Sequence, residues 1–351
     1  MGLPQIIIQF KTLAETLVSR SERGIVAVIL KDNTSTFDTK TYKKESEIVK
    51  SHYTTTNLAF LSQVFQGNPS AVIVERIGTD GSLETALERL KNKKWSWLTV
   101  PSVQSGETGA IADWIREQRS TYHKTFKAVL PDTAADSEGV VNFATDGIKV
   151  GAKTYTAAEY CPRIAGILAG LPLNRSATYY ALPEVEAISE SEDPDADIDA
   201  GKLILINDGT KIKIARSVNS LMTLTDTSGE DFKKIKIVEA ADMIRDDIRT
   251  TFEDEFIGKI ENSYDNKVIF LAAVNKYLKD LADSGVLYDK FDNKAEIDID
   301  ATAAWLKQTR DISLWDEERI KTANTGTNVF VKANIQIQDA MEDLKFTIYM
   351  N

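Results

Sequence analysis

The chain has two histidines and one cysteine, the side chains best suited to act as bases, nucleophiles or metal ligands, and none lies in a known motif. His52 and His123 lack an HExxH pattern or a neighbouring ligand residue. Asp32, His52 and a later serine follow the order of some serine proteases, but no GxSxG turn presents that serine as a nucleophile. Cys161 excludes an internal disulfide and a CxxC site, which favours a small buried hydrophobe. We therefore expect no catalytic, cofactor-binding or metal-binding residues.

Two further stretches have compositions that are found at ligand sites. Residues 78–82 (GTDGS) precede a predicted helix, whose N-terminus would attract an anion, but they lack the Walker lysine and the GxGxxG spacing. Residues 184–199 carry eight acidic residues and no basic one. They lack the EF-hand spacing and its glycine. A plain turn and a solvated loop are the simpler interpretations, with calcium binding by the acidic loop as the alternative.

Composition excludes several classes of protein. A chain of 351 residues with 42% hydrophobic and 27% charged residues is typical of a soluble protein with two or three domains. Its net charge of -11 argues against a nucleic-acid-binding surface. No window approaches the roughly 20 apolar residues that a membrane span needs. We expect a cytoplasmic protein that binds neither nucleic acid nor membranes.

Strands and helices alternate from residue 24 to about residue 240. Short apolar runs that predict buried strands lie at 24–30, 71–77, 97–100 and 126–130. Amphipathic or capped segments that predict helices lie at 57–65, 82–92, 109–121 and 157–169, the last kinked or started near Pro162. Asn207-Asp208-Gly209-Thr210 predicts a hairpin turn. The pattern indicates a layered α/β domain with a mostly parallel sheet.

A second, α+β domain is predicted to begin near Lys236. Its expected helices lie at 238–256, 267–282, 301–308 and 316–323. Residues 328–338 then alternate as a half-buried strand does. The apolar face of that strand consists of Val331, Ala333, Ile335 and Ile337.

Both ends of the chain favour strands. After an acidic break at 339–343, Phe346, Ile348 and Met350 alternate with more polar residues. This strand either folds back on 329–338 as a hairpin or completes a sheet in another subunit. Near the other end Ile6, Ile7 and Ile8 favour a strand over 5–10. The connector 12–23, if extended at ~3.3 Å per residue, would span roughly 40 Å.

Several segments together resemble the contractile tail sheath proteins of bacteriophages. They read GLPQIIIQF, RSERGIVAVIL, KTYKKESEIV, LAFLSQVFQGNPSAVIVERI, AAEYCPRIAGILAGLPLNRSATYYAL and NTGTNVFVKANIQIQDAMEDLKFTIYM. The chain is similar to the short sheaths of Gram-positive myophages, prophages and phage-tail-like R-type bacteriocins. The similarity runs nearly end to end, and its last segment is the most specific. Inserted outer domains of larger sheaths are absent.

This resemblance implies a structural protein and not an enzyme. Members have a middle domain of subtilisin-like topology without protease activity, which here implies domains at 24–235 and 236–343, flanked by arms at 1–23 and 344–351. Subunits stack as six-fold rings in a helical tube and exchange arm strands. The exchanged residues would be Ile6, Ile7, Ile8, Phe10, Phe346, Ile348, Tyr349 and Met350. The receiving sheet would contain Val331, Ala333, Ile335 and Ile337.

The resemblance also implies partners and a place of assembly. The sheath would surround an inner tail tube, contact baseplate and tail-terminator proteins, and drive the tube through a bacterial envelope on contraction. It would assemble in the host cytoplasm and leave as part of a tail particle. Tube-facing candidates are Lys307, Arg319 and Lys321, for which solvated helix faces are the alternative. The competing hypothesis is a cytosolic α/β enzyme or ligand-binding protein, whose terminal strand would pair within its own subunit.

Overall fold

The computed structural model describes residues 23–225 and 229–350, and these residues form two compact units. Residues 23–239 and 340–350 belong to the larger unit, and residues 240–339 form the smaller one. The division falls inside a long helix, α7 (Ile235–Glu255). The predicted arm residues Ile6, Ile7, Ile8 and Phe10 lie outside the described residues.

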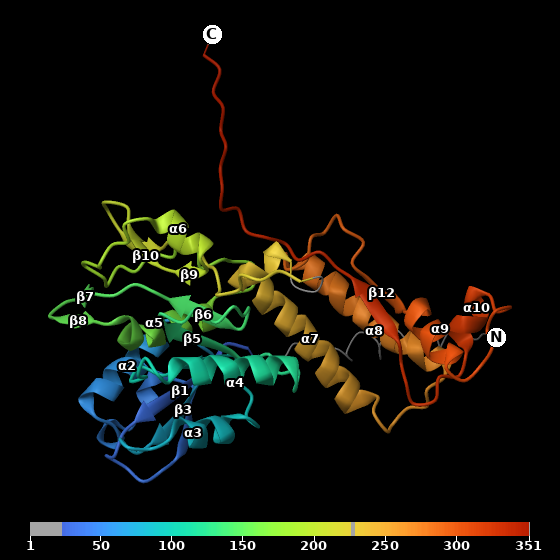
Figure 1. Cartoon of the computed structure of the whole chain (residues 1–351), viewed down its shortest axis with the longest axis horizontal. Helices are drawn as coiled ribbons and strands as arrows, with labels where there is room; N and C mark the ends of the chain where they lie inside the picture. The colour runs from blue at the N-terminus through green and yellow to red at the C-terminus, as the bar shows by residue number, and fades with distance from the viewer. Residues whose placement is uncertain (1–22, 226–228, 351) are drawn as a thin grey trace, which may run out of the picture. The chain divides into compact units, whose positions relative to one another are not determined.

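A seven-stranded sheet forms the centre of the larger unit, with strand order β2-β3-β1-β4-β5-β6-β9 (Figure 1). All neighbouring strands pair in parallel except β2, which pairs antiparallel with β3 at one edge. The strands are β1 (Ile25–Lys31), β2 (Thr39–Tyr42), β3 (Ala71–Ile77), β4 (Trp97–Thr99), β5 (Lys127–Pro131), β6 (Val140–Phe143) and β9 (Lys202–Leu203). The predicted parallel-rich α/β sheet is confirmed, while β2, β6 and β9 extend it beyond the four predicted strands.

Helices cover both faces of this sheet, which is why its inner strands are continuous apolar runs. The helices are α2 (Thr55–Phe65), α3 (Leu83–Leu90), α4 (Thr108–Ser120) and α5 (Ala157–Gly170). Val28 of β1 belongs to the same core as Phe60 of α2 and Ile164 of α5. Its neighbour Ile29 points to the other core, with Ile111 of α4. Alternate side chains of one strand therefore stabilise two different layers.

Helix α5 begins with a capping box. The Thr156 hydroxyl accepts a hydrogen bond from the Glu159 backbone N–H, and the Glu159 carboxylate accepts one from the Thr156 N–H. Pro162 lies inside the helix and does not start it. The sequence alternative of a helix beginning near Pro162 is therefore wrong, because the cap satisfies the helix end one turn earlier.

Two hairpins, three 3₁₀ helices and one short α-helix complete the described part of the larger unit. The hairpins are β7 (Ile148–Val150) with β8 (Lys153–Tyr155), and β10 (Leu205–Asn207) with β11 (Ile212–Ile214). The predicted turn at 207–210 is confirmed, and Asp208 accepts hydrogen bonds from the backbone of Thr210 and Lys211. Short 3₁₀ helices lie at η1 (Glu45–Glu47), η2 (Lys50–His52) and η3 (Glu230–Lys233).

The acidic stretch 184–199 is only partly a loop. Its end forms α6 (Pro194–Asp199), capped by the Asp193 carboxylate, which accepts from the Ala196 N–H at 3.0 Å. The sequence prediction of a loop missed this helix, although an acidic N-cap followed by proline is a helix-start signal.

The smaller unit packs helices beside a two-stranded antiparallel sheet. Its elements are the rest of α7, then α8 (Tyr264–Asp283), β12 (Lys294–Ile297), α9 (Ile299–Lys307), α10 (Glu317–Thr322) and β13 (Val331–Asn334). The helices lie within a few residues of their predicted positions. β12 was not predicted, and the expected strand 328–338 is shorter, since only β13 and an isolated bridge between Leu287 and Ile337 are paired.

Residues 344–350 form no hairpin with 329–338. β13 pairs with β12 instead, and within the described part of the chain residues 340–350 belong to no strand. None of the described helices has the length and apolar character needed to cross a lipid bilayer.

Candidate assembly surfaces

The C-terminal segment 344–350 exposes an unusual amount of apolar surface. Figure 1 shows it as an extended trace. Relative exposures of its large apolar side chains range from 71% to 94%. These residues are Leu344, Phe346, Ile348, Tyr349 and Met350. A contiguous exposed apolar segment of this kind marks an interaction site.

The base of this segment is fixed to the larger unit. Glu342 accepts a hydrogen bond from the Ser176 hydroxyl at 2.7 Å. Asp343 accepts one from the Arg216 guanidinium at 2.6 Å. These two contacts explain why residues 340–343, predicted within the C-terminal domain, group with the larger unit. The segment 344–350 therefore leaves the larger unit directly after the anchored residues Glu342 and Asp343.

The β12–β13 sheet leaves one strand uncovered. Ile297 and Ala295 of β12 lie opposite Val331 and Ala333 of β13, so these four side chains share a face. Both β12 residues are buried, and Asn275 of α8 makes hydrogen bonds of 2.7 and 3.0 Å to the Ala295 backbone. All four residues of β13 are exposed. The expected burial of Val331 and Ala333 is therefore wrong for the single chain, in which α8 contacts β12 and β13 stays exposed.

The other two residues of the predicted apolar face are partly covered. Ile335 and Ile337 are half-buried, and only Ile337 makes a bridge. Among the described strands, β13 has a neighbour on one side only. Its other edge presents backbone N–H and C=O groups that another strand can pair.

The predicted tube-facing residues lie on two helices that pack through Leu306 and Ile320. Lys307 is exposed in the last turn of α9, and Lys321 is half-buried on α10. The Arg319 guanidinium stacks over the Trp315 ring, 4.2 Å from its centroid. The sequence reading overlooked Leu314, which is 94% exposed in the loop between the helices.

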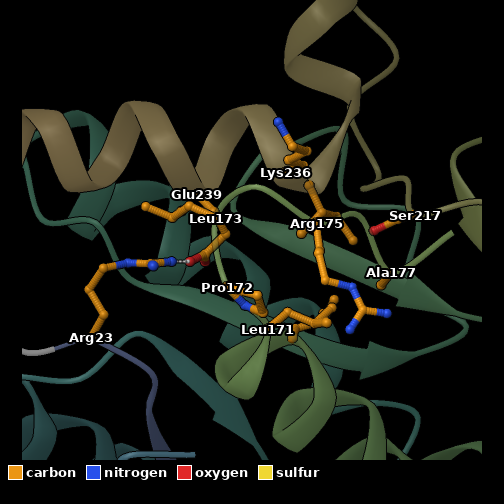
Figure 2. A pocket seen from close by; sticks show the side chains of 11 residues that line it. Arg23, Leu171, Pro172, Leu173, Arg175, Ala177, Ser217, Lys236 and Glu239 are labelled. Atoms are coloured by element: carbon orange, nitrogen blue, oxygen red, sulfur yellow. Dashed lines mark hydrogen bonds and ion pairs between the residues drawn. The ribbon is translucent and has the colours of Figure 1, made fainter. Parts of the chain in front are cut away.

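Arg23, the first described residue, is tied to the start of α7. Its guanidinium donates to the Glu239 carboxylate at 2.7 Å (Figure 2). Lys127 Nζ lies 3.1 Å from the other oxygen of Glu239 and forms an ion pair with it. The small pocket in Figure 2 measures about 20 Å³, too little for more than a water molecule. The Arg23–Glu239 contact is therefore a structural link between the start of the described chain and α7.

Asp32 and His52 do not form a catalytic pair. Asp32 accepts hydrogen bonds from the Thr54 N–H at 2.9 Å and from the Asn57 side chain at 2.7 Å. Burial would raise the pKa of Asp32, but these bonds and those from Thr34 outweigh it and hold the pKa below its usual value. His52 Nδ1 lies 3.0 Å from Lys40 Nζ. The carboxylate thus anchors the start of α2.

The other residues that the sequence offered as candidates for chemistry are buried, exposed, or paired in ordinary structural contacts. Cys161 is fully buried, and burial raises the pKa of its thiol. His123 is exposed. Glu184 of the acidic stretch pairs with the Arg163 guanidinium at 2.6 Å. Ser82 caps α3 by accepting from the Glu84 N–H, as in an ordinary turn-to-helix junction.

Residues 227–351, which include the uncovered strand and the exposed segment, match the family of the phage tail sheath C-terminal domain. The whole chain is 37% identical over 360 residues to the tail sheath protein of Clostridium phage phiCD119, covering 99% of each. The chain therefore belongs to the phage tail sheath protein family. It is a structural subunit of a tail sheath and not an enzyme. The resemblance seen in the sequence is confirmed.

Other proteins are similar to this chain at lower identity. The phage-like element PBSX protein XkdK of Bacillus subtilis is 23% identical over 296 residues, covering 76% of this chain and 63% of that protein. The contracted helical sheath of the anti-feeding prophage superposes with a TM-score of 0.71 at 12% identity, covering 96% of both chains. The sheath tail protein of Desulfitobacterium hafniense gives a TM-score of 0.69 at 15% identity, covering 79% of this chain and 90% of that one.

Proposed function

We propose that this chain polymerises by adding residues 344–350 as a strand to the free edge of β13 in a neighbouring copy. The observation that carries the proposal is that one chain has both an unpartnered apolar segment and a strand with a free edge. Phe346, Ile348, Tyr349 and Met350 would be donated, and Val331, Ala333, Ile335 and Ile337 would receive them. Each copy then both gives and accepts a strand.

The energy of such a junction is sufficient for assembly. Six or seven ladder residues at roughly 0.5 to 1.5 kcal/mol net per hydrogen bond contribute several kcal/mol. Burial of the apolar side chains adds about 25 cal/mol per Å² removed from water. Because this contact is head-to-tail and does not close on itself, it generates a helical assembly.

The N-terminal arm has the complementary role in this proposal. Ile6, Ile7, Ile8 and Phe10 form a second exchanged strand, and the connector 12–23 spans the gap to the neighbour. The Arg23–Glu239 ion pair supports this assignment by fixing the point where the connector meets the body. The arms keep subunits linked while they slide, so that a metastable extended sheath contracts without a nucleotide.

The proposal extends to the wider assembly that the family resemblance implies. We assign six-fold rings around an inner tail tube, contacts with baseplate and tail-terminator proteins, assembly in the host cytoplasm, and contraction that drives the tube through a bacterial envelope. Lys307, Arg319 and Lys321 are the tube-facing candidates. Domains at 24–235 and 236–343, with arms at 1–23 and 344–351, belong to this proposal. So does the subtilisin-like topology, with which a parallel sheet bearing an antiparallel edge strand is compatible.

Removal of residues 344–351 tests the strand donation. The truncated chain should stay folded and monomeric, because both cores lie outside the removed segment. Circular dichroism should show an unchanged melting temperature, and electron microscopy should show no tubes or ring stacks. A matched control carries Lys345→Ala and Thr347→Ala, which keep the apolar face. Long tubes from the truncated protein, or its unfolding, would contradict the proposal.

A further inference from the structure

The open edge of the sheet in the smaller unit extends beyond β13. On the paired side, the Phe330 and Gln336 carbonyls accept hydrogen bonds of 3.0 and 2.8 Å from the segment 286–298, which contains β12. The Gln338 N–H donates to the same segment at 2.9 Å. Successive residues of an antiparallel strand turn their backbone groups to opposite sides. The odd-numbered residues of 331–337 therefore turn theirs to the open side.

A contact on the far side of β12 agrees with this alternation. Ala295 of β12 lies opposite Ala333 of β13. The Ala295 N–H and C=O bond to the Asn275 side chain at 2.7 and 3.0 Å, so they point away from β13. The two alanines therefore form a pair without mutual hydrogen bonds, and the backbone groups of Ala333 face the open side. An added strand can pair with these groups and with those of the next odd-numbered residues.

Side chains along the open edge divide into two faces. The apolar face consists of Val331, Ala333, Ile335 and Ile337, and the polar face of Lys332, Asn334 and Gln336. Residues 344–350 divide in the same way. Their apolar face consists of Leu344, Phe346, Ile348 and Met350, and their other face of Lys345, Thr347 and Tyr349. Both faces stay continuous only when even-numbered donated residues lie opposite odd-numbered residues of the edge.

Two arrangements satisfy this rule and pair the whole segment 344–350 with the whole edge 331–337. One is antiparallel and the other parallel, and both place Thr347 opposite Asn334 at the centre. Shifting the antiparallel strand by two residues sets an apolar residue opposite an acidic one, which favours the unshifted register. The mismatched pairs are Ile337 with Glu342 for one shift and Leu344 with Asp339 for the other.

The direction of the added strand depends on Lys345. In the antiparallel arrangement Lys345 lies opposite Gln336, whose amide oxygen can accept from the ammonium. In the parallel arrangement it lies opposite Lys332, and like charges directly opposite destabilise a sheet. Asp300 lies 3.9 Å from Lys332, but its side chain is 95% exposed, so solvent weakens the compensation. The antiparallel arrangement therefore has the lower free energy.

We propose that residues 344–350 of a second copy pair antiparallel with 331–337, an inference that rests on the proposed strand exchange. Met350 lies opposite Val331, and Lys345 sets the direction of the strand. The apolar side chains of the added strand extend the face that β12 and β13 share.

Single cysteines in separate full-length chains test the arrangement. Chains with Met350→Cys are mixed with chains carrying Val331→Cys, assembled, oxidised and run on a non-reducing gel. We expect covalent dimers, because the two Cα atoms would lie about 5.5 Å apart, within disulfide range. Met350→Cys with Ile337→Cys should give none, since only a parallel strand brings these residues together. Both pairs keep Lys345 and Lys332 in place.

A central pair, Asn334→Cys with Thr347→Cys, reports strand exchange in either direction. Dimers from the central and parallel pairs, but not from the antiparallel pair, would overturn the direction and leave strand exchange standing. Dimers of Asn334→Cys with Lys345→Cys or Tyr349→Cys in place of the central pair would overturn the register alone. No dimers from any pair would overturn both ideas. Each variant assembled alone is the control, and the buried Cys161 gives no background.

Charge changes on the receiving edge test the role of Lys345. Gln336→Glu should lower the critical concentration for assembly and Gln336→Lys should raise it, each by up to about fivefold, the usual contribution of a cross-strand charge pair. Lys332→Glu is the matched control, because it faces Tyr349 and should not lower the critical concentration. Improved assembly of Lys332→Glu, without improvement in Gln336→Glu, would overturn the antiparallel direction.

Discussion

At the scale of single residues, Asp32 shows how a side chain with catalytic potential serves structure. It directly follows β1 and is itself only 2% exposed. Its carboxylate accepts hydrogen bonds from Thr34, Thr54 and Asn57. Thr54 is the N-cap of α2. The protease-like order of Asp32 and His52 is therefore a coincidence of spacing, and the hydrogen bonds give the carboxylate a folding role.

Replacing Asp32 with asparagine should lower stability in a pH-dependent way. The folded pKa lies below the unfolded value, so this carboxylate contributes stability above the unfolded pKa and loses it as the pH falls through the folded pKa. We expect Asp32→Asn to cost about 1 to 3 kcal/mol at pH 7, and less near pH 3. Urea unfolding at both pH values measures this.

Asp80→Asn is the matched control, because Asp80 is exposed. It should change stability by less than about 0.5 kcal/mol at pH 7. An equal effect of Asp32→Asn at both pH values would show that its charge plays no part.

At the scale of elements, α9 and α10 present mixed charges, and the loop between them exposes Leu314. Their small core of Leu306, Ile312 and Ile320 keeps both helices in place, so surface charges can change without loss of folding. Arg319 also stacks on Trp315, which fixes its direction. A polar contact of this kind would suit the proposed inner tube, which would have to separate from the sheath on contraction.

Reversing Arg319 and Lys321 to glutamate should weaken co-sedimentation with the tube protein, several-fold or more. Binding of the parent chain should fall as salt rises, because exposed charges are screened over about 10 Å at 0.1 M. Lys279→Glu is the control, since Lys279 is exposed on α8 and belongs to neither helix. Unchanged tube binding by the Arg319 and Lys321 variant would exclude this surface.

At the scale of the whole molecule, the two ends carry the proposed links between subunits. The C-terminal segment leaves the larger unit at Glu342 and Asp343, and the N-terminal connector meets it at Arg23. Two arms that reach different neighbours would hold a sliding lattice together, whereas one arm would produce only a chain of subunits.

Ile7→Pro should block assembly while the monomer melts normally, because proline removes a donor from the exchanged strand. Ile7→Val, which keeps the strand preference, is its control. Electron microscopy should show tubes only with valine. Tubes of normal length with proline would mean that residues 5–10 are not an exchanged strand.

Shortening the connector 12–23 by half should act differently. The strand can still pair, but the reach of the arm is limited, so particles should form in one state and fail to convert to the other. Sheath length and diameter are measured by electron microscopy before and after acid or denaturant. Normal contraction of the shortened variant would show that the connector does not link subunits.

The sequence by itself determined the elements with strong local signals. The apolar runs at β1 and β3, the spacing in α7 and α8, and the turn at Asn207-Asp208-Gly209-Thr210 are each written into neighbouring residues, so their periodicity was sufficient. Short strands such as β6 and β12 were missed, because four residues give too little periodicity and their pairing depends on distant partners.

The tertiary structure alone decided which of these surfaces remain open. The alternation from Val331 to Ile337 predicted a buried face, but in the single chain α8 contacts β12 and β13 stays exposed. Close packing of α2 and α5 requires Gly67, Gly166 and Gly170, where a side chain would collide with the facing backbone. Lys267, Asn262 and Thr325 likewise meet only in the fold. Local sequence periodicity reports which side of an element is apolar, and only long-range packing determines whether anything covers it.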